Sequence, residues 1–254
     1  MGNNGKDNLI KFLTIIVLFL CIILIISGIY KQVPPGMRTL LFDKTVNRFH
    51  EIFYNNNETW AKNTWFGILA LQNPNDVWIT QEIISEIKPD FIVETGTFMG
   101  GSALLWATIL AQINPQGKVI TIDIEDKSEE ARKFAIAKDK IEFIIGSSAD
   151  TNIINSIKKR VAGKKVLVIL DSDHRRAHVL NELSLYWEMV PVGSYLIVQD
   201  THLNGHPVHH SFGPGPMEAV NEFLSKNDKF VADQTRERLL LTFYPGGYLK
   251  RVKS

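Results

Sequence analysis

The sequence of 254 residues contains little cysteine and almost no net charge. Its single cysteine, Cys21, excludes an intrachain disulfide bond and any zinc or iron–sulfur site built from several cysteines. The 28 lysine and arginine residues balance 27 acidic residues, and a formal charge of +1 provides no field that attracts a polyanion. We therefore do not expect nucleic acid as a partner. A hydrophobic content of 45% with 22% charged residues is typical of a globular chain.

The seven histidines lack the usual sequence mark of a mononuclear iron site, because none begins an H-x-D or H-x-E motif. Four of them lie close together: His202, His206, His209 and His210. Gly205 and Pro207 indicate that this segment is a loop, and no H-E-x-x-H helix accompanies it. We therefore disfavour a zinc site.

One long apolar run stands out near the N-terminus. Residues 12–30 carry no charge and lie between Lys11 and Lys31. At about 1.5 Å per residue, the run approaches the roughly 30 Å thickness of a bilayer's hydrocarbon core. We expect a transmembrane anchor; the alternatives are a cleaved signal peptide and a buried core helix. Because more basic residues follow the run than precede it, we expect a single-pass membrane protein with its C-terminal part in the cytoplasm.

The pattern divides the chain into four segments: a short tail at 1–11, the anchor at 12–30, a juxtamembrane connector at 31–60 and one domain at 61–254. The connector contains prolines and an Asn-rich stretch, with one short helix expected near residues 45–53.

Within the domain, short apolar runs alternate with helical patterns, which indicates a parallel sheet covered on both faces. The expected buried strands are 91–94, 118–123, 141–145, 166–170 and 194–198. The expected helices are 101–113, 128–137, 151–161, 176–189 and 216–225. Two last runs, 230–233 and 239–244, are separated by a polar connection too short for a crossover helix, so we expect an antiparallel pair. The fold class is α/β, a doubly wound sheet of seven strands with an antiparallel last strand.

A glycine-rich turn follows the first of these strands, from Glu94 to Ser102. Gly96 allows a tight turn, while Gly100 and Gly101 let a ligand approach the backbone and the next helix. The spacing G-x-x-x-G-G differs from the G-x-G-x-x-G of dinucleotide folds. The acidic Glu94 favours a cationic ligand, such as the sulfonium and amino groups of S-adenosylmethionine. The alternative is a purely structural turn.

The next two strands also end in polar residues. Asp123 is placed to accept the hydroxyls of a ribose, with a helix N-cap as the alternative. Ser147 and Ser148 suit the edge of an adenine, unless Ser148 or Asp150 only caps the following helix.

The fourth and fifth strands end in a second kind of cluster. Asp171 and Asp173 follow one, and Gln199 and Asp200 follow the other. Oxygen ligands at neighbouring strand ends are what Mg²⁺ requires, although solvated loop carboxylates are the alternative. His174 or His202 is the expected base for a hydroxyl proton, unless the histidine has no catalytic role.

Together these motifs resemble the cephalosporin hydroxylase/rhamnosyl O-methyltransferase family over about Trp65 to Val252. The motifs are 93–97 with 100–102, 170–174, 195–201, 204–208 and 212–220. The resemblance implies a class I S-adenosylmethionine-dependent methyltransferase with a Rossmann-like sheet. It implies cofactor contacts at Glu94, Gly96, Gly100, Ser102 and Asp123, and we expect Thr95, Gly101, Ser147, Ser148 and Asp171 to contact the cofactor as well. It also implies Mg²⁺ held by Asp171 or Asp173 with Asp200, beside Gln199, where the family usually has glutamate.

We therefore expect a Mg²⁺-assisted O-methyltransferase that acts on a hydroxyl of a sugar-containing, lipid-linked or natural-product acceptor. The membrane anchor would hold the site near a membrane-borne acceptor, and loops around 60–74 and 202–216 would form its pocket. A homo-oligomer is compatible with this prediction. The alternatives are a membrane-anchored cofactor-binding protein without activity and an NAD-dependent oxidoreductase.

Overall fold

The computed structural model describes residues 11–20, 22 and 35–254. The chain forms two compact units, Met1–Arg48 and Phe49–Ser254. The second unit begins before residue 61, where the sequence pattern placed the start of the domain. It includes the last turns of helix α2 (Pro35–Asn55). The candidate site lies wholly within this second unit.

The predicted transmembrane helix at 12–30 needs correction. Among the described residues, no helix combines the length and the apolar character needed to cross a membrane. Residues 11–20 are helical. Helix α2 is longer, but it contains Asp43, Lys44, Arg48 and Glu51, and charges are costly in a bilayer. Residues 21 and 23–30 of the predicted span lie outside the described part. This finding overturns the predicted anchor, and with it the single-pass location and the cytoplasm-facing domain.

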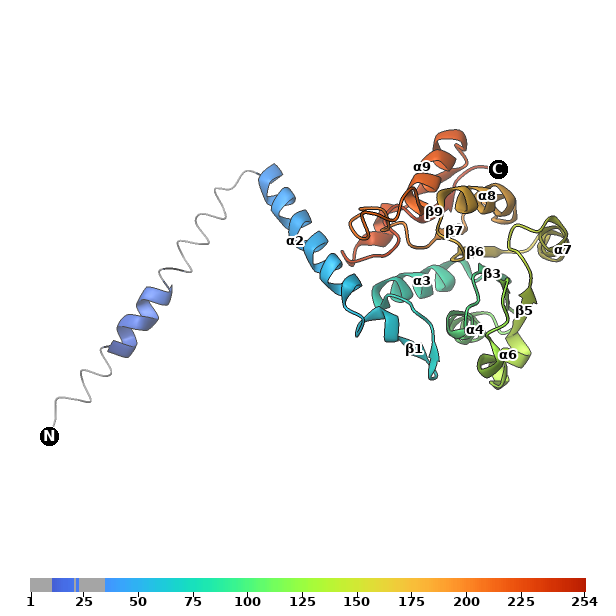
Figure 1. Ribbon diagram of the computed structural model, residues 1–254, viewed down its shortest axis with the longest axis horizontal. Coiled ribbons are helices and arrows are strands. Elements are labelled where there is room, and N and C mark those ends of the chain that lie inside the picture. Colours follow the sequence, from blue (N-terminus) through green and yellow to red (C-terminus); the bar gives the residue numbers. More distant parts are fainter. Residues whose placement is uncertain (1–10, 21, 23–34) are drawn as a thin grey trace. The chain divides into compact units, whose positions relative to one another are not determined.

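A seven-stranded sheet forms the centre of the second unit (Figure 1). Its strand order is β5-β4-β3-β6-β7-β9-β8. Five strands are parallel: β3 (Phe91–Thr95), β4 (Lys118–Asp123), β5 (Ile141–Ile145), β6 (Val166–Leu170) and β7 (Tyr195–Val198). The last strand, β9 (Tyr248–Arg251), is antiparallel to both β7 and β8 (Phe230–Ala232). The prediction of a seven-stranded α/β sheet with a reversed last strand is confirmed.

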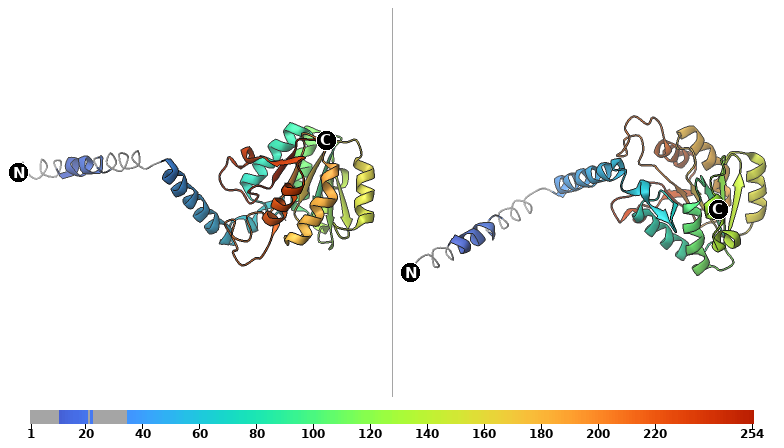
Figure 2. Two further views of the ribbon diagram at one scale, coloured as in Figure 1. Left: turned by 90° about the horizontal axis from the view of Figure 1, so that it is seen from above. Right: turned by 60° about the horizontal axis from the view of Figure 1, so that its bottom comes forward.

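Helices cover both faces of the sheet because successive strand side chains point to opposite faces (Figure 2). Val93 and Val168 belong to one core, with three helices: α7 (Thr151–Val161), α8 (Arg176–Tyr186) and α9 (Pro216–Lys226). Ile92 and Ile169 belong to the opposite core, with α3 (Pro74–Ile87) and α4 (Gly101–Ile113). Because β3 to β7 pair in parallel, their carboxyl ends share one edge of the sheet.

Most predicted elements are present with small differences in their bounds. The bounds of α4 and α7, and of β4, β5 and β6, coincide with the predicted ranges. The predicted helix at 128–137 is instead two short helices, α5 (Glu129–Arg132) and α6 (Ala135–Lys140), because the backbone at Phe134 is extended. Helix α3 is an addition to the predicted elements. The remaining short elements are η1 (Trp60–Lys62), β1 (Thr64–Trp65), β2 (Ile68–Leu69), η2 (Trp187–Met189) and η3 (Gln234–Glu237).

The predicted strand at 239–244 is wrong, because β9 takes its place in the sheet. Residues 241–244 are buried, and the carboxylate of Asp76 in α3 accepts hydrogen bonds from two of their polar groups. The Phe243 N–H donates to Asp76 Oδ2 at 2.7 Å, and Thr242 Oγ1 donates to Asp76 Oδ1 at 2.5 Å. A segment whose buried groups are satisfied by a side chain needs no neighbouring strand.

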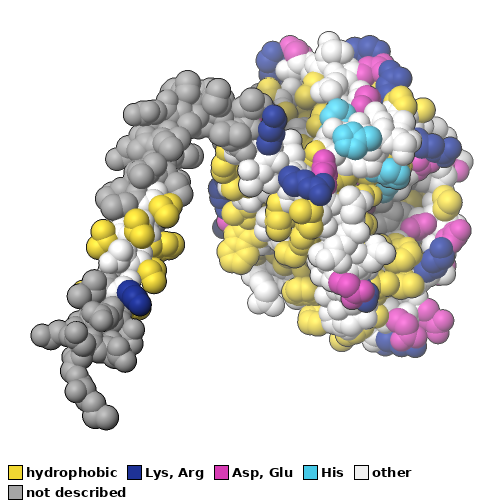
Figure 3. Space-filling view, turned by 60° about the vertical axis from the view of Figure 1, so that its left-hand side comes forward, with side chains coloured by type: hydrophobic (Ala, Val, Ile, Leu, Met, Phe, Trp, Pro, Cys, Tyr) yellow, Lys and Arg dark blue, Asp and Glu magenta, His cyan; other side chains and the backbone are white. Residues whose placement is uncertain are grey.

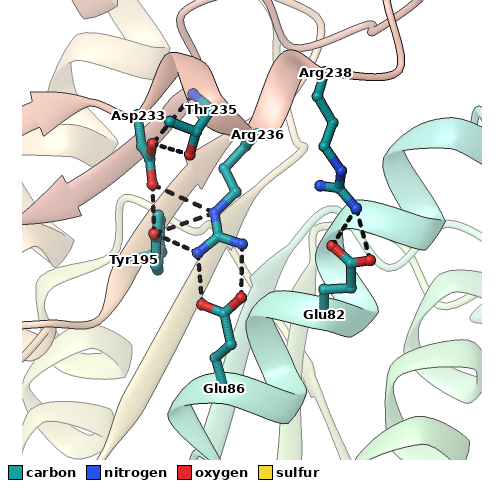
Figure 4. A network of polar contacts seen from close by, with 7 residues as sticks. All are labelled: Glu82, Glu86, Tyr195, Asp233, Thr235, Arg236 and Arg238. Atoms are coloured by element: carbon teal, nitrogen blue, oxygen red, sulfur yellow. Dashed lines mark hydrogen bonds and ion pairs between the residues drawn. The ribbon is translucent and has the colours of Figure 1, made fainter.

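Two arginines anchor the segment that follows β8 to helix α3 (Figure 4). Arg236 donates to both carboxylate oxygens of Glu86 at 2.8 and 2.6 Å. Arg238 donates to both oxygens of Glu82 at 2.7 and 2.6 Å. Such paired hydrogen bonds fix orientation as well as distance. The polar connector therefore holds the chain against α3, beside the residues that lead to the site.

Candidate active site

A cavity of about 770 Å³ lies at the carboxyl ends of the parallel strands. Its walls contain residues that follow each of the five strands: Gly96 and Phe98, Asp123 and Ile124, Ser147 and Ser148, 171–175, and Gln199 and Asp200. Because neighbouring parallel strands end at one edge, residues far apart in the sequence converge here. The expected convergence of Asp123, Asp171 and Asp200 on one cavity is therefore observed.

The glycine-rich turn is shaped by packing as much as by the cavity. Gly96 lines the cavity with φ of +88°, and a Cβ atom there would lie 1.9 Å from the carbonyl oxygen of Asp171. Gly101 lies outside the lining, and its Cβ would lie 2.2 Å from the carbonyl oxygen of Leu69. Gly100 and Thr95 also lie outside the lining, whereas Ser102 is part of it. The turn needs glycines where backbones nearly touch.

Glu94 is fully buried and is not among the residues that line the cavity. Its carboxylate accepts hydrogen bonds from Trp106 Nε1 at 2.9 Å and from Thr121 Oγ1 at 2.6 Å. Burial raises the pKa of Glu94 to about 7, although these hydrogen bonds act in the opposite direction. In this arrangement Glu94 joins β3, β4 and α4 behind the cavity wall. Its place near the end of β3 predicted that it lies close to the cavity, but not whether its side chain lines the wall or lies behind it.

This placement of Glu94 leads to a prediction for Glu94→Gln. Between about pH 4.5 and 7 the folded chain keeps a proton on Glu94 that the unfolded chain loses. The free energy of unfolding therefore falls as the pH rises through this window, by the order of 3 kcal/mol from this group. Denaturant unfolding at pH 5 and pH 8 should show a smaller pH-dependent loss in the variant. Calorimetry should show unchanged affinity for S-adenosylmethionine, and a large loss would place Glu94 against the cofactor.

Asp123 and the serines lie on the part of the cavity wall that follows β4 and β5. Asp123 Oδ2 accepts the Phe98 N–H at 2.8 Å and so holds the glycine-rich loop against the end of β4. Ser148 Oγ lies 3.2 Å from His178 Nε2, and both residues line the cavity. Asp150 caps α7 by accepting the N–H groups of Asn152 and Ile153, so Ser148 is left facing the cavity.

Asp171, His174 and Asp200 form a cluster in which one ligand atom from each lies within 4.8 Å of the others. His174 Nε2 lies 3.2 Å from Asp200 Oδ2. Burial raises the pKa of Asp171, and the carboxylate of Asp200 raises it further. For Asp200, burial opposes ionisation, but His174 and His202 lower the pKa below its ordinary value. Two half-buried carboxylates at short range are compensated well by a cation, so this donor set fits a metal ion.

The two other predicted metal ligands are placed differently. Asp173 lines the cavity but accepts hydrogen bonds from Arg175 Nε at 2.9 and 2.8 Å, and Arg175 lowers the pKa of Asp173 to about 2. Asp173 is thus paired with a cation of the chain and is not one of the cluster's three members. The side-chain oxygen of Gln199 accepts from Gln72 Nε2 at 3.1 Å.

Gln72 and Tyr244 complete this part of the site. Gln72 Nε2 also lies 3.4 Å from Asp171 Oδ2, and Tyr244 donates its hydroxyl proton to Gln72 Oε1 at 2.5 Å. Gln72 therefore bridges the ends of β6 and β7 with its orientation fixed by the tyrosine. Sequence reasoning missed both residues, because neither follows a parallel strand and no motif marks them.

The two candidate bases occupy different environments. His174 lines the cavity, whereas His202 is fully buried and does not. The ring of His202 lies 4.2 Å from that of Phe243, and its Nδ1 lies 2.9 Å from Nε2 of His50. Burial, and then His202, lower the pKa of His50 to about 3. Of the two expected bases, His174 is therefore the one that can face an acceptor.

The histidine-rich loop after β7 is held by Glu218 at the start of α9. His206 Nε2 lies 3.0 Å from Glu218 Oε1, and the Gly215 N–H donates to Oε2 at 2.7 Å. Figure 3 shows histidine side chains on one face of the second unit. His209 and Phe212 of this loop line the cavity. The loop thus forms a fixed wall beside the carboxylate cluster.

The sheet order, with β9 antiparallel between β7 and β8, defines the class: a Rossmann-like methyltransferase fold. The solved structure described as "CmcI-N160 apo-structure" matches 76% of this chain and 77% of its own, with a TM-score of 0.57 and 19% identity. The structure "cmcI-D160 Mg-SAM" matches 75% of this chain and 77% of its own, also with a TM-score of 0.57 and 19% identity. At this identity, the likeness shows the fold alone.

Sequence similarity identifies the family. The chain belongs to the Rhamnosyl O-methyltransferase/CmcI family, whose model matches residues 57–252. The rhamnosyl O-methyltransferase of Mycobacterium bovis (strain BCG / Pasteur 1173P2) is 38% identical over 215 residues, which cover 82% of this chain and 86% of that protein. The rhamnosyl O-methyltransferase of Mycobacterium leprae (strain TN) is 35% identical over 213 residues, covering 82% and 91%. The chain is thus an S-adenosylmethionine-dependent methyltransferase.

Proposed function

We propose that this protein transfers the methyl group of S-adenosylmethionine to a hydroxyl of a sugar-bearing acceptor, with assistance from Mg²⁺. The observation that carries the proposal is the cluster of Asp171, His174 and Asp200 on one cavity wall. The wall after β3, β4 and β5 offers the contacts for the methyl donor. The names of the mycobacterial relatives support a rhamnosyl acceptor.

The donor would occupy the part of the cavity formed after β3, β4 and β5. Asp123 would accept hydroxyl groups of the ribose, because a carboxylate offers several acceptor positions besides the one used by Phe98. Ser147 and Ser148 would lie against the adenine, and Ser102 with the backbone at Gly96 would lie near the amino acid part. Asp171, at the next strand end, would complete this set.

Asp171 and Asp200 would hold the cation, with the side-chain oxygen of Gln199 as a neutral third ligand. The bound ion would lower the pKa of an acceptor hydroxyl and so make it a better nucleophile. Glutamine offers an oxygen but no charge, so this site has less negative charge than one with glutamate at that position. Gln72 would keep the Gln199 oxygen oriented through its hydrogen bond.

His174 would accept the hydroxyl proton. Its Nε2 atom lies 3.2 Å from Asp200 Oδ2, so the carboxylate can orient the ring and stabilise its protonated form. Methyl transfer also needs the acceptor oxygen in line with the sulfonium methyl group, and positioning of this kind contributes strongly to the rate. The cavity walls would supply that positioning.

Aromatic side chains support the choice of acceptor class. Tyr54, Trp60, Phe212 and Phe243 line the same cavity as the carboxylate cluster. Pockets with aromatic walls and a few fixed polar groups orient ligands that have both apolar and polar faces, as a deoxy sugar does. Trp60 and Phe212 come from the two segments in which the sequence placed the acceptor loops.

The proposal is tested by incubating the purified protein with S-adenosylmethionine and rhamnose-bearing acceptors. We expect a product heavier by about 14 mass units for each methyl group transferred. Chelation of divalent cations should abolish transfer, added Mg²⁺ should restore it, and Gln199→Glu should lower the Mg²⁺ concentration needed. The proposal fails if wild type and Gln199→Glu bind the donor in calorimetry but transfer no methyl group with Mg²⁺ present. Preferential binding of NAD would also overturn it.

A further inference from the structure

We infer that His50 is a positioning residue of this site: acting through His202, it fixes the Asp200 carboxylate at the cavity. His202 Nε2 lies 3.1 Å from Asp200 Oδ1, and His202 Nδ1 lies 2.9 Å from His50 Nε2. The three side chains therefore form a chain that runs from helix α2 to the cavity wall. The inference rests on the proposed function, because it concerns the same carboxylate.

With His202 neutral, one hydrogen arrangement pairs the three groups, although the 3.1 Å contact between His202 Nε2 and Asp200 Oδ1 falls short of a good hydrogen-bond angle. An ionised carboxylate only accepts hydrogen bonds, so the proton of a neutral His202 must be on Nε2. His202 Nδ1 then carries a lone pair, and His50 Nε2 must donate to it. Because both histidines are buried, an unmatched ring nitrogen would be costly. His50 thus selects the form of His202 that can donate to Asp200.

Packing leaves the two imidazole rings little freedom. The His50 ring is stacked on that of Phe243, at 5.4 Å and an interplanar angle of 3°. Tyr54 meets the His202 ring edge-on at 4.9 Å. Asp200 itself has φ of +56°, an unusual value for a residue with a side chain, which persists only when the surroundings enforce it. The histidine chain supplies one of those constraints on Asp200.

The second carboxylate oxygen of Asp200, Oδ2, links the histidine chain to the site. Asp200 Oδ2 lies 3.2 Å from His174 Nε2 at the cavity, while Oδ1 faces the buried His202. Holding Oδ1 therefore fixes where Oδ2 lies relative to Asp171 and His174. Removal of a group that hydrogen-bonds to a metal ligand, without itself contacting the metal, commonly changes cation affinity or activity by about 10–100-fold.

Two variants separate positioning from simple filling of space. His50→Phe keeps a ring beside Phe243 but removes the N–H, whereas His50→Gln places an amide N–H near the position of Nε2. In the full-length chain, with Mn²⁺ as a spectroscopic probe of the cation site, we expect His50→Phe to weaken binding by about tenfold. His50→Gln should restore most of that affinity, and donor affinity measured without cation should be unchanged in both.

The hydrogen arrangement can also be measured without any variant. The ¹⁵N chemical shifts of the imidazole in wild type should show His202 with its proton on Nε2, and His50→Phe should disturb this tautomer. A proton on Nδ1 of His202 in wild type would overturn the inference. It would also be overturned if His50→Phe changed neither the Mn²⁺ affinity nor the His202 tautomer. If wild type binds no Mn²⁺ and transfers no methyl group, the proposed function fails, whereas the tautomer still reports on His50.

Discussion

Replacing Asp200 by asparagine should lower the rate of methyl transfer by about 10²–10⁴-fold, the range over which positioned acid–base groups act. Asparagine keeps the size of the side chain but removes the charge that faces His174 at 3.2 Å. It also removes one of the two carboxylates in the cluster. The site would then neither stabilise a protonated His174 nor hold a cation well. A radiometric assay at saturating donor and Mg²⁺ measures the loss.

Asp173→Asn is the matched control for this experiment. The sequence motif predicts Asp173 as a metal ligand together with Asp171, but the structure pairs it with Arg175. The substitution should therefore reduce turnover far less than Asp200→Asn. Both variants should bind S-adenosylmethionine with the affinity of wild type in calorimetry. Equal losses of turnover in the two variants would contradict the assignment of Asp200 to the reacting centre.

Replacing Gly96 by alanine should destabilise the fold by about 3 kcal/mol or more, because two costs add. The backbone at Gly96 has φ of +88°, which a residue with a Cβ adopts only with strain. The new Cβ would also lie 1.9 Å from the carbonyl oxygen and 2.6 Å from the carbonyl carbon of Asp171. Neither backbone atom can move without separating β3 from β6. Denaturant unfolding of the purified variant measures the loss, and donor binding should fall with it.

Gly163→Ala separates the two costs. Gly163 has φ of +71°, but a Cβ there would meet no atom within 4 Å. This variant should therefore show only the conformational cost of roughly 1–2 kcal/mol. If Gly96→Ala is no less stable than Gly163→Ala, the close approach of the β3 and β6 ends does not constrain the turn. The same comparison shows how much of the glycine motif is structural.

The sequence predicted the parallel strands well because they are buried on both faces. Val166–Leu170 is a continuous apolar run, and every one of its residues is buried in the sheet. The helices between the strands show similarly clear starts, such as Asp150 before α7. The polar residues that end these strands were therefore placed correctly at one edge. A local pattern sufficed, because each of these features depends on a short stretch of chain.

The prediction of β9 failed for a reason that the sequence pattern does not contain. Residues 239–244 are the more apolar run, since 248–251 includes Lys250 and Arg251, but the Phe243 N–H donates to Asp76 and not to a neighbouring strand. That carboxylate is separated from Phe243 by 167 positions. The role of His202 was open for a similar reason, since its neighbours His50 and Phe243 are remote in sequence.

The sequence by itself determined the α/β sheet, its glycine-rich turn and the polar strand ends, because hydrophobic spacing and backbone freedom are encoded over a few residues. Only the tertiary structure decided which polar residues face the cavity. It buried Glu94 behind the wall, paired Asp173 with Arg175, and joined His50 and Gln72 to the carboxylates. These outcomes depend on contacts between distant segments, where burial and charge pairing set the state of each group.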